Sequence, residues 1–191
     1  MRRILGLLLV LALAACAGMH GPPPIAEQMT AVQLRLFIIV EEKRHRLDTR
    51  AKPLMLDPQL VAAAQKHADA MAKAHAMDET TPDHNPAIKA LMADPKFQGF
   101  VGENIAQQFY NASEGVDVDK FAQAYLEIWL KSDEHRRNLA FYGFNRTGIG
   151  IATDGKAIFV SEIFSTDLGL PPPPDEPPAT ATSTSTPAPA Q

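Results

Sequence analysis

The residues with the clearest chemical potential are a histidine and a glutamate that lie in different predicted elements. Ser132 is followed by two acidic residues and then His135, an order that predicts a helix whose serine cap accepts the amide of His135. Glu103 lies in a predicted strand, on the same side as apolar residues, and a carboxylate in that position requires a partner. A carboxylate and an imidazole are the residue types that general acid–base chemistry uses, so Glu103 and His135 are the first candidates for a functional site.

Two predicted helices must hold these groups in place. Apolar residues at helical spacing predict a helix over 118–131, with Trp129 packed in its buried face. An Asp-Pro pair predicts the start of a second, alanine-rich helix over about 58–72. His67 lies on the buried face of that helix, where we expect a hydrogen-bonded core histidine rather than a ligand.

The remaining elements are an earlier helix, a strand and a hairpin. The helix is expected to begin near Thr30 and to end in a solvated basic segment at 43–46. Alternating residues predict a strand over 101–109. An Asp-Gly pair between two alternating runs predicts a β-hairpin over 148–164.

The first residues have the features of an export signal that ends at a lipidated cysteine. Two arginines precede the apolar run 4–15, which is too short to span a bilayer comfortably. The run ends in Leu-Ala-Ala-Cys and resembles a bacterial lipoprotein signal, in which Cys16 would be acylated and become the N-terminus. The alternative is an ordinary signal cleaved nearby. Ala17 resembles the outer-membrane sorting pattern, so we expect an exported, lipid-anchored envelope protein, at the outer membrane if the source has two membranes.

The composition predicts one folded domain with flexible ends. The chain has 191 residues, of which 46% are hydrophobic and 21% charged, as a soluble core requires. We expect a signal peptide at 1–15, a flexible tether at 16–27, a domain at 28–167 and a disordered Pro/Thr/Ser-rich tail at 168–191.

The charge balance excludes one class of partner. Lys and Arg number 18 against 22 Asp and Glu, a net charge of −4. Affinity for phosphates needs a basic face, so we expect no nucleic-acid partner. The expected partners are a membrane, through the lipid anchor, and a lipid, peptide or peptidoglycan ligand, while the oligomeric state stays open.

Several sequence blocks, taken together in order, resemble the CAP superfamily of cysteine-rich secretory, antigen 5 and pathogenesis-related 1 proteins, also called SCP or PR-1-like domains. The resemblance covers about residues 30–165 and implies an α+β fold, a three-layer α-β-α sandwich with a small antiparallel sheet. The blocks that carry it are 54–72, Gly-Glu-Asn-Ile-Ala at 102–106, Trp-Leu-Lys-Ser-Asp-Glu-His-Arg-Arg-Asn-Leu at 129–139 and Phe-Asn-Arg-Thr-Gly-Ile-Gly at 144–150.

The resemblance also implies a cleft. In the family two histidines and two acidic residues line it, and some members hold a divalent metal such as zinc there. Glu103 matches one acid and His135 one histidine. Ser132 stands in place of the second acid, as in many bacterial members, and Glu79 stands in place of the first histidine. His84 follows five residues later and His75 precedes Glu79 by four, and either could reach the cleft, although neither matches the family spacing.

These departures leave the metal question open. His135, Glu103 and Glu79 could hold zinc or another divalent ion with one position open for water. Alternatively, a proton shared between the carboxylates or with His135 could satisfy the site, and this metal-free interpretation is the one we favour. Asn104 and Asn138 are expected to bond backbone groups beside the cleft.

Two functions follow from the resemblance. The first is a membrane-anchored binding module that takes a lipid, peptide or cell-wall ligand in the cleft around Glu103 and His135. The alternative is a hydrolase of peptide or wall substrates, in which Glu103 and His135 would be catalytic, with or without metal. We favour binding, because a catalytic constellation needs several converging groups and only two match.

Overall fold

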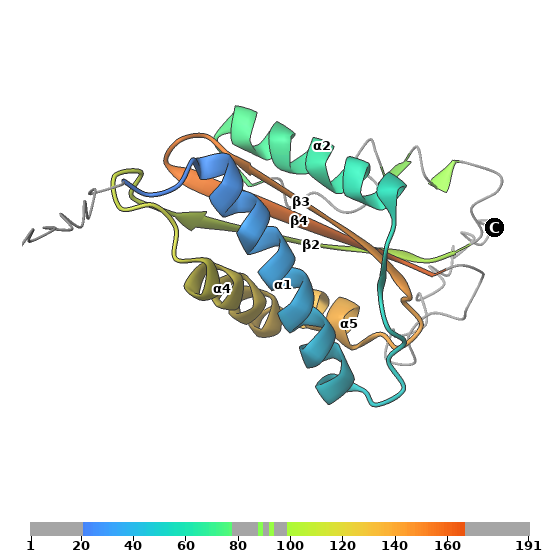
Figure 1. Cartoon of the computed structure of the whole chain (residues 1–191). Helices are drawn as coiled ribbons and strands as arrows, with labels where there is room; N and C mark the ends of the chain where they lie inside the picture. Colours follow the sequence, from blue (N-terminus) through green and yellow to red (C-terminus); the bar gives the residue numbers. More distant parts are fainter. Residues whose placement is uncertain (1–20, 78–87, 90–91, 94–98, 167–191) are drawn as a thin grey trace, which may run out of the picture.

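The computed structural model describes residues 21–77, 88–89, 92–93 and 99–166. The predictions for the signal peptide, Cys16, Glu79, His84 and the tail after 167 lie outside these residues. Within them, three layers are present: a sheet with helices on both faces (Figure 1). The predicted three-layer α-β-α architecture is therefore confirmed. None of the described helices has the length and apolar character needed to cross a membrane.

The sheet has the order β1-β3-β4-β2. Its strands are β1 (Met55–Leu56), β2 (Val101–Phe109), β3 (Arg146–Thr153) and β4 (Ala157–Ser165). β3 and β4 form the predicted antiparallel hairpin, and β2 pairs with the other side of β4, also antiparallel. The short β1 is parallel to β3. The long central strand β4 is thereby buried along its whole length.

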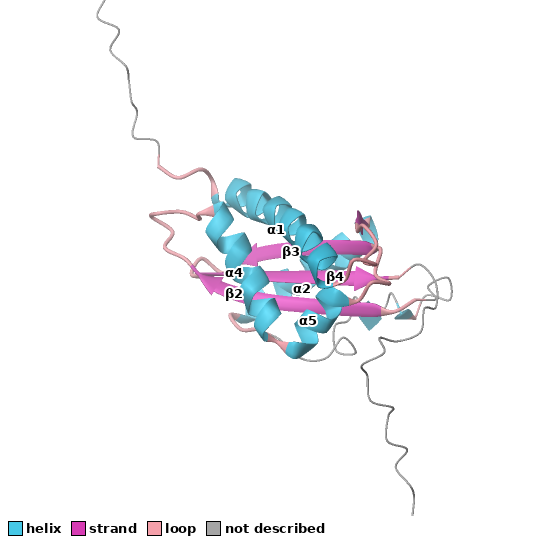
Figure 2. Cartoon of the chain, turned by 90° about the horizontal axis from the view of Figure 1, so that it is seen from below, coloured by secondary structure: helices cyan, strands magenta, loops and turns pink. Residues whose placement is uncertain are grey.

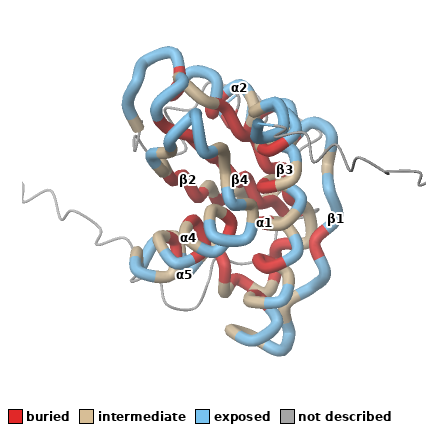
Figure 3. Tube along the Cα trace, turned by 60° about the vertical axis from the view of Figure 1, so that its left-hand side comes forward, coloured by how far each residue is buried: buried red, intermediate tan, exposed pale blue. Residues whose placement is uncertain are grey.

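Helices cover the two faces unequally. One face carries α2 (Pro58–Ala74), and the other carries α1 (Ile25–Leu47), α4 (Val118–Lys131) and α5 (Asp133–Ala140), as Figures 1 and 2 show. Figure 3 shows the buried residues gathered between these layers. The prediction that α1 begins near Thr30 is wrong. The helix begins after Pro24, and Thr30 lies inside it, its hydroxyl donating to the carbonyl of Ala26.

The packing of α2 on the sheet depends on two glycines of β3. A Cβ at Gly148 would lie 2.1 Å from backbone atoms of Leu60 and Val61, and one at Gly150 would lie 2.2 Å from the backbone at Ala64. No side chain fits there, so the backbones of helix and strand touch. The alanines on the buried face of α2 allow this close packing of the helix on the sheet.

The largest core cluster lies on the opposite face, between the sheet and α1, α4 and α5. Trp129 is fully buried in it, and its indole N–H donates to the carbonyl of Ile105 at 2.9 Å. The core-packing role predicted for Trp129 is confirmed. That bond also occupies a backbone carbonyl of β2, the edge strand, and so ties α4 to it.

One prediction about the end of α1 needs correction. Of the basic residues at 43–46, Arg44 is buried, with 1% of its surface exposed. Its guanidinium donates to the carbonyls of Leu139, Phe141 and Phe144. The prediction of a solvated segment is therefore wrong for Arg44. A run of charged residues predicts a solvated face unless a tertiary partner is known.

Candidate functional site

Glu103 forms the centre of a buried polar cluster on the α2 face of the sheet. Its Oε1 lies 2.6 Å from Nδ1 of His67 and accepts a hydrogen bond from the hydroxyl of Ser161 at 2.7 Å. The side chains of His67 and Glu103 are 5% and 6% exposed, and Ser161 is fully buried. An ionised carboxylate can only accept, so Nδ1 of the histidine is then the donor. Three different elements, α2, β2 and β4, supply this cluster.

The partner of Glu103 follows from strand alternation and register. Ser161 lies directly opposite Ile105, two residues from Glu103 on β2. Side chains of alternate residues share a face, so Glu103, Ile105 and Ser161 all project towards α2. His67 lies on the sheet-facing side of that helix, as predicted for a hydrogen-bonded core histidine. The sequence did not identify Glu103 as its partner.

The next residue of β2 belongs to the opposite face. Asn104 is fully buried, and its amide donates to the backbone carbonyl of His135 at 3.1 Å. Asn138 donates to the backbone carbonyl of Glu103 at 3.1 Å and to the side-chain carbonyl of Asn104 at 2.9 Å. Both asparagines therefore bond backbone groups, as expected from the sequence. Together they bind α5 to the edge strand β2.

Gly102 allows α5 to approach this closely. A Cβ on Gly102 would lie 2.7 Å from the side-chain oxygen of Asn138 and 3.0 Å from the ring of Phe144. The glycine before Glu103 is thus a packing requirement. It leaves room for the Asn138 amide to reach the strand.

Ser132 caps α5 as predicted. Its hydroxyl accepts the amide of His135 at 3.3 Å. His135 lies on the side of the sheet covered by α5, and its side chain is half-buried. The carboxylate of Glu103 contacts His67 and Ser161 on the α2 side. The structure thus pairs Glu103 with a histidine that the sequence did not suggest for it.

The structure describes two of the candidate metal ligands, Glu103 and His135. Glu79 and His84 lie outside the described residues. Within the described residues no group of three or more His, Cys, Asp or Glu side chains is arranged to hold a metal ion. Glu103, His67 and His135 each take part in at least one further interaction. The complete environment of the carboxylate is therefore larger than His67 and Ser161.

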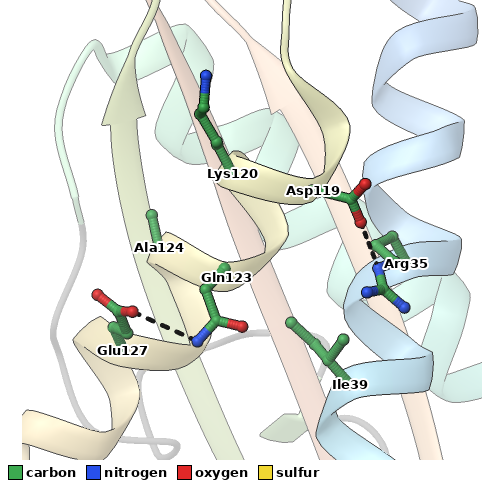
Figure 4. Close-up of a pocket in the computed structure, with 7 residues that line it drawn as sticks. All are labelled: Arg35, Ile39, Asp119, Lys120, Gln123, Ala124 and Glu127. Carbon is green, nitrogen blue, oxygen red and sulfur yellow. Dashed lines mark hydrogen bonds and ion pairs between the residues drawn. The ribbon is translucent and has the colours of Figure 1, made fainter.

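A pocket of about 550 Å³ lies elsewhere, between α1 and α4 (Figure 4). The ion pair between Arg35 and Asp119, 2.6 Å long, crosses it, and both side chains are exposed. Ile39 forms an apolar part of its wall. This pocket is separate from the Glu103 cluster, which lies on the opposite face of the sheet.

A family model for the cysteine-rich secretory protein family, CAP, matches residues 43–166. This is more than half of the chain. The chain belongs to the CAP family. A search of curated proteins gives no match.

Solved CAP-like structures agree on the fold. An outer surface protein of Borrelia burgdorferi is 21% identical with a TM-score of 0.52, and the match covers 77% of this chain and 98% of that chain. An extracellular protein containing an SCP domain from Bacillus anthracis is 24% identical with a TM-score of 0.53, covering 77% of this chain and 45% of that one. A cysteine-rich secretory protein of Staphylococcus aureus is 20% identical with a TM-score of 0.54, covering 76% and 41%. At these identities the likeness shows the CAP fold alone.

Proposed function

We propose that this protein is an exported, lipid-anchored CAP domain that acts as a binding module for a lipid, peptide or cell-wall fragment. The observation that carries the proposal is the state of Glu103. Its carboxylate oxygen already accepts from Ser161 and contacts His67 inside the fold. A buried carboxylate with two such partners stabilises the junction of three elements. A general base, in contrast, must be within reach of a substrate proton.

The envelope location is proposed from the first sixteen residues and from the neighbours. Arg2, Arg3 and the apolar run before Cys16 favour export and acylation. The B. burgdorferi neighbour is described as an outer surface protein and the B. anthracis neighbour as extracellular. An anchored binding module beside the wall would meet lipid, peptide and peptidoglycan ligands.

A hydrolase is the second candidate, and one observation favours it. The contact of 2.6 Å between Nδ1 of His67 and Glu103 resembles the way a carboxylate orients a catalytic imidazole. In that case the other ring nitrogen of His67 would act on substrate, and Glu103 would position it. His135 and Glu103 as the acid–base pair remain the hypothesis from the sequence.

The experiment that separates these functions uses protein purified from native membranes. Mass spectrometry of the bound small molecules should find one class of lipid, peptide or wall fragment in near-stoichiometric amount. The same preparation should not degrade peptides or peptidoglycan. Turnover of either substrate that Glu103→Gln abolishes, in a variant that unfolds at the wild-type temperature, would overturn the binding proposal in favour of the hydrolase.

Metal content is tested on the same preparation. Because Glu79 replaces the family histidine, we expect zinc well below one equivalent per chain. His135→Ala should leave this amount unchanged, with His45→Ala, an exposed histidine on α1, as the matched control. A full equivalent of zinc that only His135→Ala removes would establish a metal centre instead.

A further inference from the structure

A second buried polar cluster lies on the α1 and α5 face of the sheet and has no part in the Glu103 cluster. Its members are Arg44 of α1, with 1% exposure, and Glu162 of β4, which is fully buried. Glu162 follows Ser161, the partner of Glu103, so alternation turns its side chain to the opposite face. The two clusters lie back to back on neighbouring residues of one strand.

Arg44 holds the end of α5 and the loop that leads to β3. Its Nη1 donates to the carbonyl of Leu139 at 2.9 Å and to that of Phe141 at 3.3 Å, and its Nη2 donates to the carbonyl of Phe144 at 3.0 Å. The last carbonyls of a helix have no partner within the helix. The guanidinium supplies that partner and carries positive charge at the negative end of α5.

The charge of this guanidinium acts on Glu162, and one oxygen of the Glu162 carboxyl group forms no hydrogen bond with the described residues. Its Oε1 accepts from the hydroxyl of Thr147 at 3.0 Å. Its Oε2 is buried and has no hydrogen-bond partner in the described part of the chain, and the same holds for Nε of Arg44. That Nε lies 3.8 Å from a carboxylate oxygen of Glu41, too far for a hydrogen bond. One nitrogen of Arg44 and one oxygen of Glu162 are thus both without a hydrogen bond to the described residues within one cluster.

The groups that face Glu162 can be named element by element. From α1 the charged ones are Arg44 and Glu41, from β3 the neighbour is Thr147, and from β2 it is Asn104, directly opposite in the register. Burial is the main influence and raises the pKa of Glu162 to about 8, while Thr147 and Arg44 act in the opposite direction. A pKa raised in this way favours the protonated carboxyl near neutral pH.

We propose that the protonation of Glu162 controls how tightly Arg44 holds α5. Neutral Glu162 leaves the guanidinium to the backbone carbonyls of Asn138, Leu139, Phe141 and Phe144. Ionised Glu162 offers a carboxylate oxygen, which is a stronger acceptor than a carbonyl, and attracts the guanidinium with its unfilled Nε towards β4 and away from those carbonyls. Loss of those bonds loosens the end of α5, where Asn138 bonds β2 at Glu103 and Asn104. The proton state of one buried group is thereby coupled to the helix that carries His135, whatever the ligand.

Hydrogen exchange on the full chain tests this coupling. After correction for the intrinsic effect of pH, amides of 138–144 should exchange about fivefold faster at about pH 9 than at about pH 6, because the carbonyls have lost Arg44. The corrected exchange rates of the α2 amides should be the same at both pH values. In Glu162→Gln, which mimics the protonated acid, the pH effect on 138–144 should disappear, whereas Glu42→Gln, an exposed glutamate of α1, should keep it.

Infrared spectroscopy identifies the proton directly. Wild type at neutral pH should show the carbonyl stretch of a protonated carboxylic acid, and Glu162→Gln should lack it. Thr147→Val removes a hydrogen bond that lowers the pKa of Glu162, so it should move the midpoint of both signals to higher pH. The proposal is overturned if wild type lacks the stretch, or if 138–144 exchange with the same pH dependence in wild type and Glu162→Gln.

Discussion

Glu103 contacts two side chains of the described residues that are distant from it in sequence, Ser161 on β4 and His67 on α2. The alternation of residues along β2 correctly predicted that the Glu103 carboxylate lies on the apolar side of its strand and needs a partner. The sequence also predicted that His135, which lies in a family block with a defined cap, meets Glu103, and that pairing stays a prediction. The strand pattern cannot say which helix covers which face, and in the structure α2 covers the face of Glu103 while α5 covers that of Asn104.

Ser161→Ala tests the energetic role of the cluster. The variant removes a buried donor to Glu103 and leaves part of the acceptor unsatisfied, so it should lower the free energy of unfolding by about 1–3 kcal/mol. Urea unfolding measures the loss. Thr30→Ala is the control. It removes an exposed hydroxyl that bonds a carbonyl of its own helix, and it should change the free energy of unfolding by less than about 0.5 kcal/mol. Equal effects of the two changes would show that Ser161 does not support Glu103.

Ionisation of Glu162 should lower the stability of the folded protein as the pH rises. Burial raises its pKa from 4.5 to about 8, so between these values the folded chain keeps a proton that the unfolded chain has lost. Stability from this group is therefore full at about pH 4 and falls as pH rises towards 8. Glu162→Gln should melt a few degrees higher than wild type at about pH 8 and close to it at about pH 4 to 5. A larger gain at the acid end would contradict the buried, protonated carboxyl.

At the scale of elements, local signals predicted most of the boundaries. Asp57 caps α2 through the amides of Gln59 and Leu60, Ser132 caps α5, and the Asp-Gly hairpin joins β3 to β4. The failures were tertiary. The start of α1 is set by the prolines before Ile25 rather than by a side-chain cap. Arg44 is buried because α5 and its following loop present carbonyls to it.

The contact between α2 and β3 has no tolerance for a side chain. Gly148→Ala would place a methyl group 2.1 Å from the backbone of α2, so helix and sheet must separate, at a cost of about 3 kcal/mol or more. Thermal unfolding would show the loss as a lower Tm. Gly21→Ala, where nothing lies within 4 Å of the added carbon, is the control and should leave Tm unchanged. A wild-type Tm for Gly148→Ala would mean that α2 does not pack on this strand.

For the whole molecule, the order of blocks along the chain predicted the fold well, since helix, strand and hairpin patterns together allow few arrangements. Residues 43–166, which the CAP model matches, contain every element of the sheet. The ligand could not be predicted, because the family resemblance supplies a cleft and no shared reaction. The pocket between α1 and α4 was not foreseen either, since its lining of charged residues reads as a solvated surface.

The proposed anchor gives a prediction for the intact protein. Cys16→Ser removes the only thiol of the chain, so it should block acylation and move the protein from the membrane fraction to the soluble fraction of the envelope. Fractionation of cells that produce each form measures this. Ala17→Ser keeps the cysteine and should stay with the membrane. Membrane recovery of Cys16→Ser equal to wild type would contradict a lipid anchor.

The central claim is that the CAP domain binds a ligand and that Glu103 is a structural centre. The most direct test combines mass spectrometry of molecules bound to the natively purified protein with activity on peptides and peptidoglycan, for wild type and Glu103→Gln. We predict a near-stoichiometric ligand in wild type and no turnover by either protein. An empty wild-type protein that degrades one of these substrates, and loses that activity in a stably folded Glu103→Gln, would contradict the account.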